Sequence, residues 1–444
     1  MTKNLSKTDR VRGLGTGIVL LALAAALPAS AAPQLMTDYG DQWAWRSGDI
    51  NAMGGTGIAL YRGGLSNLYN PAMLALETGT RLDAGLAVDQ ESEDRFVPLF
   101  DTFSSWVADA SVAANRNHFW QSGFGAARRV LDGRVPLTAA LSLTDRYPFE
   151  YGFEEEIRNP DPFNTGPQRD MIMETRSREL EGTLRNLSLG LGAAVHERVS
   201  VGFAAHYAFG TRTDTWAVRD FDTADGDSSY AQTYEQDVDG INVTFGLRGV
   251  VNERVEIGLA WESRLKASGD FSDVRTAAGT GTVVDETRAG HWKYPDIYRA
   301  GLAFRPRTDP ATVFTIEFEY MPWSQTEDTE KPADLNAARM NDTMDVRVGV
   351  QHTFYNGVPV RFGFRHYDSY MDKEASASAF SGGVGLPFGD GLISVSLELT
   401  KLTGILDHQF PYSPDYWGDA YFADPEARVE DTRFRVGVGY TLNF

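Results

Sequence analysis

The sequence contains no cysteine among its 444 residues, so disulfide bonds, thiol catalysis and metal sites built on thiolates are excluded. Positive charge is scarce, because 41 Lys and Arg residues stand against 61 Asp and Glu residues, a formal net charge of −20. Binding to nucleic acid needs a basic surface, so we expect no nucleic-acid partner. No apolar run after the first thirty residues is long enough for a membrane-spanning helix. Glycine (44) and aromatic residues (25 Phe, 18 Tyr, 9 Trp) are plentiful, which suits strands joined by tight turns.

Residues 1–31 have the pattern of a secretory signal peptide. Four Lys and Arg residues precede an apolar run from Ile18 to Leu27, and the small residues Ala29-Ser30-Ala31 follow it. A membrane anchor would need about 20 apolar residues, and this run is shorter. We therefore expect residues 1–31 to be removed during export.

The remaining chain alternates between apolar and polar residues. Leu187, Leu189 and Leu191 alternate with Ser188 and Gly190, and the same period of two recurs over 199–207, 313–320, 346–351 and 393–399. A period of two indicates strands with one apolar face. These segments are longer than the strands of most soluble proteins, and the residues opposite the apolar ones are small or charged. The pattern predicts a transmembrane β-barrel with lipid outside and a polar lumen.

Short and long connections alternate along this region. Asp132-Gly133 and Asn356-Gly357 are typical of tight hairpin turns, whereas longer acidic or proline-rich stretches are expected as loops at 101–115, 151–178, 216–234, 270–290, 328–342 and 408–430. The segments between Arg81 and Phe444 predict an all-β, antiparallel barrel of about fourteen strands over residues 80–444. An even number of strands places both termini on the periplasmic side of a Gram-negative outer membrane.

The C-terminal strand supports an outer-membrane location independently. It ends in a ladder of alternating apolar residues, Phe434, Val436, Val438, Tyr440, Leu442 and Phe444. Outer-membrane barrels resemble this in ending on a strand with an aromatic last residue, which the barrel-assembly machinery reads. We therefore expect that machinery, outer-membrane lipid and lipopolysaccharide as partners.

A segment of different character, residues 32–79, precedes the barrel. It combines a glycine-rich stretch with an Asn-Pro-Ala triplet, and its notable residues are Gly54, Gly55, Gly57, Asn70, Pro71 and Ala72. The wall has no room for this segment, so we expect it inside or beneath the lumen. The glycine-rich stretch, the triplet and the barrel together resemble the FadL/TodX family of outer-membrane hydrocarbon transporters.

The resemblance implies a function and a gate. In that family an N-terminal hatch plugs a fourteen-strand barrel, and hydrophobic small molecules, either long-chain fatty acids or aromatic hydrocarbons, cross by passive diffusion. Ligand leaves sideways through a gap made by a kinked third strand, and the third strand here, 134–149, contains Pro136 and Pro148. Proline cannot donate a ladder hydrogen bond, so a gap near Pro148 is one interpretation. The other is that both prolines only end the strand.

Two features leave alternatives open. An aromatic-rich stretch with Tyr39, Trp43 and Trp45 has no match in the family pattern. Similar glycine-rich and Asn-Pro-Ala segments also occur in barrels that serve secretion systems or surface assembly. A non-transport barrel acting as a secretion or assembly partner is therefore the alternative function.

Aromatic residues supply the candidate ligand contacts. Near the second long loop we expect either a capture surface or part of an aromatic belt, formed by Phe149, Tyr151, Phe153 and Phe163. A girdle at the membrane boundary is predicted for Trp120, Trp261, Trp292, Trp323 and Tyr440.

Catalytic and metal chemistry are not expected. Asp407-His408 and His366-Asp368 are the nearest acid–histidine pairs, and neither brings a recognisable nucleophile. The seven histidines are not at metal-ligand spacing, and the aspartates of 220–227 lack the spacing of an EF-hand. We predict no catalytic residues, no metal and no cofactor.

Overall fold

The computed structural model of the chain describes residues 38–41, 47–100, 106–158, 171–221, 228–329, 340–370, 376–407, 410 and 426–444. Strands dominate it, and all of them belong to a single antiparallel sheet. In chain order they are β1 Thr80–Phe100, β2 Trp106–Leu131, β3 Leu137–Pro148, β4 Tyr151–Arg158, β5 Ile172–His196, β6 Val199–Asp220, β7 Tyr230–Asn252, β8 Val255–Glu262, β9 Leu265–Ala277, β10 Gly281–Tyr294, β11 Ile297–Phe304, β12 Thr312–Met321, β13 Glu327–Asp328, β14 Thr343–Thr353, β15 Pro359–Asp368, β16 Ser376–Phe388, β17 Gly391–Asp407 and β18 Glu426–Asn443.

The sheet closes into a barrel of fourteen wall strands, as the sequence predicts. Closure comes from β1 and β18, which pair from Arg81↔Asn443 to Phe96↔Arg428. Four wall strands are each interrupted once, and they consist of β3 with β4, β8 with β9, β10 with β11, and β12 with β13. Proline lies at three of these interruptions, at 148, 295 and 322, because its nitrogen cannot donate to a ladder.

The two faces of the wall explain why the sequence alternates. On β5 the side chain of Leu189 is 64% exposed while that of Asn186 is 1% exposed, so apolar residues point out and polar residues point in. The same outward apolar face continues around the barrel, for example at Phe245 and Phe362. A water-soluble barrel would reverse this arrangement. An outward apolar band is the surface that a transmembrane barrel presents to lipid.

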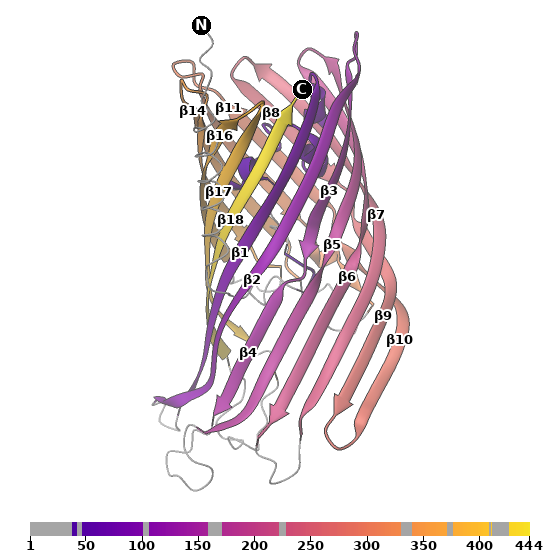
Figure 1. Cartoon of the computed structure of the whole chain (residues 1–444), viewed down its shortest axis with the longest axis vertical. Coiled ribbons are helices and arrows are strands. Elements are labelled where there is room, and N and C mark those ends of the chain that lie inside the picture. Colours follow the sequence, from indigo (N-terminus) through magenta and orange to yellow (C-terminus); the bar gives the residue numbers. More distant parts are fainter. Residues whose placement is uncertain are drawn as a thin grey trace.

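The wall is taller than the sequence predicts. Short turns lie at one end of the barrel, here called the turn end, and the opposite end is called the loop end (Figure 1). Stretches expected as loops at the loop end are partly strand, since 106–115 lies in β2, 151–158 is β4, and 270–290 forms most of the β9–β10 hairpin. These predictions were wrong because strands that rise above the apolar band carry polar residues on both faces and resemble loops in sequence.

Short helices form the plug. They are α2 Gly48–Asn51, η2 Gly64–Leu68 and η3 Pro71–Leu76, and the wall encloses them towards the turn end (Figure 1). A further short helix, η4 Trp323–Gln325, follows β12. Among the described residues, no helix is long and apolar enough to cross a membrane.

Glycine lets the plug touch the wall. Gly54 has φ +68°, and its N–H donates to Ser381 Oγ at 2.9 Å. Opposite it on β15, a Cβ added to Gly363 would lie 2.0 Å from the Gly54 nitrogen. Only two glycines allow backbones this close. This contact seats the glycine-rich stretch against the wall.

Charged side chains complete the seal in the lumen. Glu317 Oε2 accepts hydrogen bonds from the N–H groups of Gly57 (2.8 Å) and Ile58 (3.0 Å). The Glu317 carboxylate is in turn paired with Arg347 at 3.1 Å. Arg299 Nη1 donates to the Leu68 carbonyl at 3.2 Å. Buried charges of this kind need partners, and here the plug backbone is one of them.

Candidate lumenal site and lateral gap

The third wall strand separates from the second over part of its length. Residues Gly123–Leu131 of β2 pair with β3, and Ser111 and Val112 pair with β4, but residues 113–122 have no backbone pairing on that side. On its other side the third strand stays paired with β5 throughout. β3 ends in mid-wall at Pro148, and β4 resumes at Tyr151 (Figure 1). A lateral gap therefore lies between β2 and the third strand.

Side chains hold the margins of this gap. Near its turn-end margin Asp145 Oδ2 accepts from the Ser122 N–H at 2.7 Å. At the loop-end margin Asn117 Nδ2 donates to the Gly152 carbonyl at 2.8 Å. Between them, the third strand leaves its ladder with β2 after Thr144, and Pro148 follows four residues later at the end of β3. Pro136 lies elsewhere, just before β3 at the turn end, where its carbonyl accepts from Ala194 N–H.

A cavity of about 700 Å³ opens at the gap. Its walls combine apolar side chains from β2, the third strand, β5 and β6 with several carboxylates. The lining residues are Asn117, His118, Phe119, Phe149, Glu150, Glu179, Leu180, Glu181, Gly182, Thr183, Arg185, Phe209, Gly210 and Thr211. Gly182 and Gly210 have positive φ angles, and a Cβ on either would collide with the neighbouring strand's carbonyl.

An aromatic cluster fills the lumen behind the gap. Tyr147 stacks on Tyr294 with ring centroids 4.1 Å apart, and Phe149 meets Trp292 edge-on at 6.3 Å. Tyr151 and Phe153 also belong to the buried cluster. Tyr151 and Phe153 are thus buried residues of β4, Phe149 is buried in the break between β3 and β4, and Phe163 lies outside the described residues.

Two tryptophans predicted for the membrane girdle belong to this cluster instead. Trp292 is 2% exposed and Trp323 is 1% exposed, and Trp323 stacks on Tyr370 at 4.4 Å. The prediction was wrong for both because they lie beyond the apolar band, where the wall encloses an apolar lumen. Trp120, by contrast, is 52% exposed on the outer face, as a girdle residue should be.

Tyr39 brings the N-terminal segment into the cluster. Its ring lies 5.8 Å from Trp323 and 6.0 Å from Tyr370. Its hydroxyl donates to Asp328 at 2.9 Å, and its carbonyl accepts from the Tyr294 hydroxyl at 2.9 Å. Burial, and then the Asp328 carboxylate, raise the pKa of Tyr39 above its ordinary value, so it stays a neutral donor. The sequence signal for this residue was the aromatic-rich stretch that matched no family pattern.

The arginines around the cluster are paired with carboxylates. Arg178 contacts Asp214 at 2.7 Å and Asp38 at 3.0 Å, and its guanidinium lies over the Trp216 ring at 4.4 Å. Arg95 pairs with Glu93. Each guanidinium is therefore neutralised while it packs against an aromatic face.

The Asn-Pro-Ala triplet fastens the hatch internally and to the wall. Asn70 Oδ1 accepts from the Ala72 N–H at 3.1 Å and caps η3, which Pro71 begins. The Asn70 amide donates to the Ile58 carbonyl at 2.8 Å and to the Leu247 carbonyl of β7 at 3.1 Å. The structure thus brings the triplet next to the glycine-rich stretch that contains Gly57, whereas Gly55 lies against Arg347 of β14.

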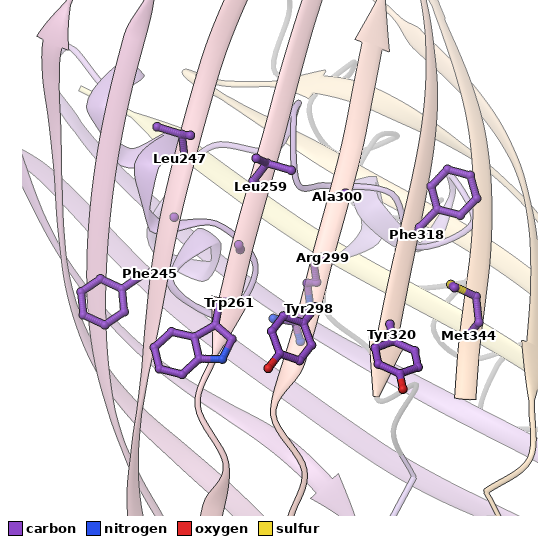
Figure 2. A pocket seen from close by; sticks show the side chains of 12 residues that line it. Phe245, Leu247, Leu259, Trp261, Tyr298, Arg299, Ala300, Phe318, Tyr320 and Met344 are labelled. Atoms are coloured by element: carbon purple, nitrogen blue, oxygen red, sulfur yellow. The ribbon is translucent and has the colours of Figure 1, made fainter. Parts of the chain in front are cut away.

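A separate groove of about 560 Å³ lies on the outer face of the barrel. The rings of Phe245, Trp261, Tyr298 and Tyr320 stand side by side across neighbouring strands, while Arg299 points to the other side of the wall (Figure 2). The rings face outward and are partly exposed. Their arrangement is that of an aromatic girdle, and the predicted girdle residue Trp261 belongs to it.

These features define a class: an antiparallel β-barrel of fourteen wall strands, plugged by its N-terminal segment and with backbone pairing interrupted between its second and third strands. Solved structures share this fold. The toluene transporter TodX of P. putida matches with a TM-score of 0.60 at 13% identity, over 91% of this chain and 99% of that one. A Pseudomonas aeruginosa FadL homologue matches at 0.59 and 11% identity, over 94% and 100%.

The Ralstonia pickettii toluene transporter TbuX matches similarly, with a TM-score of 0.57 at 13% identity, over 91% of this chain and 99% of that one. No family model matches the chain, and no curated protein matches it. The resemblance to the FadL/TodX family is therefore confirmed at the level of the fold. At such identities, function has to be argued from the site itself.

Proposed function

We propose that this protein is an outer-membrane transporter for the uptake of hydrophobic small molecules. One observation carries the proposal: Phe149 both lines the lateral cavity and packs in the lumenal aromatic cluster. Phe149 is fully buried, so this one side chain forms the boundary between the apolar interior and the cavity in the wall. A barrel that served only as a scaffold would have no need for an apolar interior next to a wall cavity. The toluene transporters with the same fold support the same reading by analogy.

The path follows from this geometry. A hydrophobic molecule enters from the loop end, binds among the aromatic side chains that include Tyr151 and Phe153, and leaves sideways between β2 and the third strand. Pro148 stands at this exit. Movement is by passive diffusion, because transfer of a hydrophobic molecule from water into apolar surroundings is favourable and needs no energy source. In this proposal Phe163, which lies outside the described residues, contributes to ligand capture.

The hatch closes the axial route. A lumen of ~14 strands is too wide to be filled by wall side chains alone, so the segment that contains Gly54, Gly55, Gly57 and the triplet Asn70-Pro71-Ala72 acts as the gate. We also propose that residues 1–31 are a removed signal peptide, that 32–79 form the hatch domain and 80–444 the barrel, and that both termini are periplasmic. Phe444 would present the last strand to the barrel-assembly machinery, and outer-membrane lipid and lipopolysaccharide would surround the wall.

The test is uptake by cells with and without the gene. Radiolabelled toluene and a labelled long-chain fatty acid should enter faster when the protein is present, and Phe149→Arg, which places a charge at the junction, should reduce that difference severalfold. The matched control is Thr287→Arg, which places the same charge on an exposed residue of the β9–β10 hairpin. Phe304→Arg would be unsuitable, because the Phe304 side chain faces lipid. Gene-independent uptake across a broad panel of compounds would favour the alternative, a secretion or assembly barrel.

A further inference from the structure

The groove on the outer face of the barrel is apolar at its base and polar at its loop-end rim. Two rows of paired residues cross it. The row nearer the turn end consists of Leu247, Leu259, Ala300 and Phe318. The next row consists of the rings of Phe245, Trp261, Tyr298 and Tyr320 (Figure 2). The Tyr320 hydroxyl donates at 2.8 Å to Asp342, which precedes β14 at the loop end, so the polar side of this row points that way.

Two lysines lie opposite each other beyond this rim. Residues 32–444 contain only five lysines, yet Lys266 of β9 and Lys293 of β10 are directly paired across the ladder. Both face outward, because the residues that flank them on each strand are buried. They follow Trp261 and Tyr298 by five residues on the same two wall strands, which is at most about 17 Å. Like charges directly opposite each other are destabilising, and a bound anion would relieve their repulsion.

Carboxylates neutralise this lysine pair only in part. Lys293 forms an ion pair with Glu327. Lys266 is exposed, and in the part of the chain that the structure describes no carboxylate lies within 4.0 Å of its ammonium group. Asp239 lies diagonal to Lys266 in the ladder of β7 with β9, but it is hydrogen-bonded to a tyrosine hydroxyl at 2.9 Å. The pair therefore keeps one accessible ammonium group.

A guanidinium lies between the rings and the lysines. The side chain of Arg264 is 55% exposed, although it pairs with Asp296 at 2.9 Å. We call Arg264, Lys266 and Lys293 the basic layer. Its three positive charges face two carboxylates, so this layer is positive in a chain whose net charge is −20. An apolar groove and an accessible positive layer thus follow each other along the same strands, which suits an anionic amphiphile.

We infer that the groove and the basic layer bind lipopolysaccharide. The lipid anchor of lipopolysaccharide, lipid A, is a disaccharide that carries phosphates and several acyl chains. One acyl chain lies in the apolar rows, the amphipathic rings pack at the boundary between chain and sugar, and the basic layer binds a phosphate. The loop end is the outer side in the proposed orientation, and lipopolysaccharide is the lipid of that leaflet. The inference rests on the outer-membrane location and orientation given under Proposed function, and not on transport.

The test is titration of purified, detergent-solubilised protein with bisphosphorylated lipid A, with the bound lipid counted by native mass spectrometry. The double variant Lys266→Gln, Lys293→Gln should bind about tenfold more weakly than the wild type, or worse. Ala300→Trp fills the apolar row without changing the charge, and it should also weaken binding. The matched control is Lys401→Gln, which removes an exposed lysine on the outer face of β17 and should bind like the wild type.

Phosphatidylglycerol distinguishes this site from general attraction to anionic lipid. The wild type should prefer bisphosphorylated lipid A over phosphatidylglycerol by about tenfold or more. Equal binding of the two lipids, or equal binding of lipid A by the wild type and the double lysine variant, overturns the inference and leaves the proposed transport function standing.

Orientation is tested separately with Thr280→Cys, at the exposed tip of the β9–β10 hairpin, in a chain that has no other cysteine. A membrane-impermeant maleimide should label this variant on intact cells. Labelling only after the cells are broken would overturn the proposed orientation, and with it the assignment of this groove to the outer leaflet.

Discussion

The contact between Gly54 and Gly363 makes the seating of the hatch testable with a single methyl group. In Gly363→Ala the new Cβ would stand 2.0 Å from the Gly54 nitrogen, whereas ordinary contact begins at 3.4 Å. To reach ordinary contact, the two atoms must therefore move apart by 3.4 − 2.0 = 1.4 Å. The hydrogen bond from Gly54 N–H to Ser381, 2.9 Å long, would then exceed hydrogen-bonding distance.

This movement destabilises only the state in which the hatch is seated against the wall. Overpacking of this kind typically costs about 1–3 kcal/mol, which would raise the population of unseated hatch by roughly 5- to 150-fold. We expect purified Gly363→Ala in liposomes to admit arabinose faster than the wild type, and cells that carry it to become more sensitive to small hydrophilic antibiotics. Barrel assembly should persist, seen as different migration of boiled and unboiled samples in a detergent gel.

A second lumen-facing glycine provides the control. A Cβ on Gly439 would lie 3.6 Å from the Gly48 nitrogen of the hatch and from the Ala84 carbonyl oxygen, which is ordinary contact. Gly439→Ala should therefore behave like the wild type in both assays. Wild-type permeability in assembled Gly363→Ala would refute the view that this close contact holds the hatch closed.

Two further predictions concern the gate and the gap. Replacing Asn70 and Pro71 with alanine removes both hydrogen bonds that the Asn70 amide donates to carbonyls. Leakage of small antibiotics should therefore rise severalfold while the barrel still assembles. Unchanged leakage and uptake would mean that the triplet is only a turn. The pair Asn117→Cys, Gly152→Cys should form a disulfide across the gap, since a Cβ at 152 would lie 3.2 Å from Asn117 Cγ and the chain has no other cysteine. Oxidation should lower decanol uptake by the double variant, and dithiothreitol should restore it. Uptake by each single variant should be unchanged by either treatment. Equal uptake by the oxidised and reduced double variant would exclude this gap as the exit.

The alternation of residues in the sequence was enough to predict the barrel. Leu187, Leu189 and Leu191 lie on the outer face because a strand sends successive side chains to opposite sides. Apolar side chains on an outer face are favourable in lipid and unfavourable in water. The turns followed as directly: Gly133 and Gly357 have positive φ angles in the structure, as tight turns require. Both are local properties, and local properties are readable from one chain.

The aromatic cluster, the gap and the height of the wall depended on contacts between residues far apart in the chain. Trp292 and Trp323 look like girdle residues in sequence, and only closure of the barrel packs Trp323 against Tyr39 and Trp292 against Phe149, each pair more than 140 positions apart. Pro148 was compatible with a strand end as well as with a kink; in the structure β3 ends at Pro148, and the wall strand resumes as β4 at Tyr151 on the same partner, β5. A period of two in the sequence shows that successive side chains face opposite sides of a strand. Which of these sides faces lipid, water or a distant strand is decided only when the sheet closes.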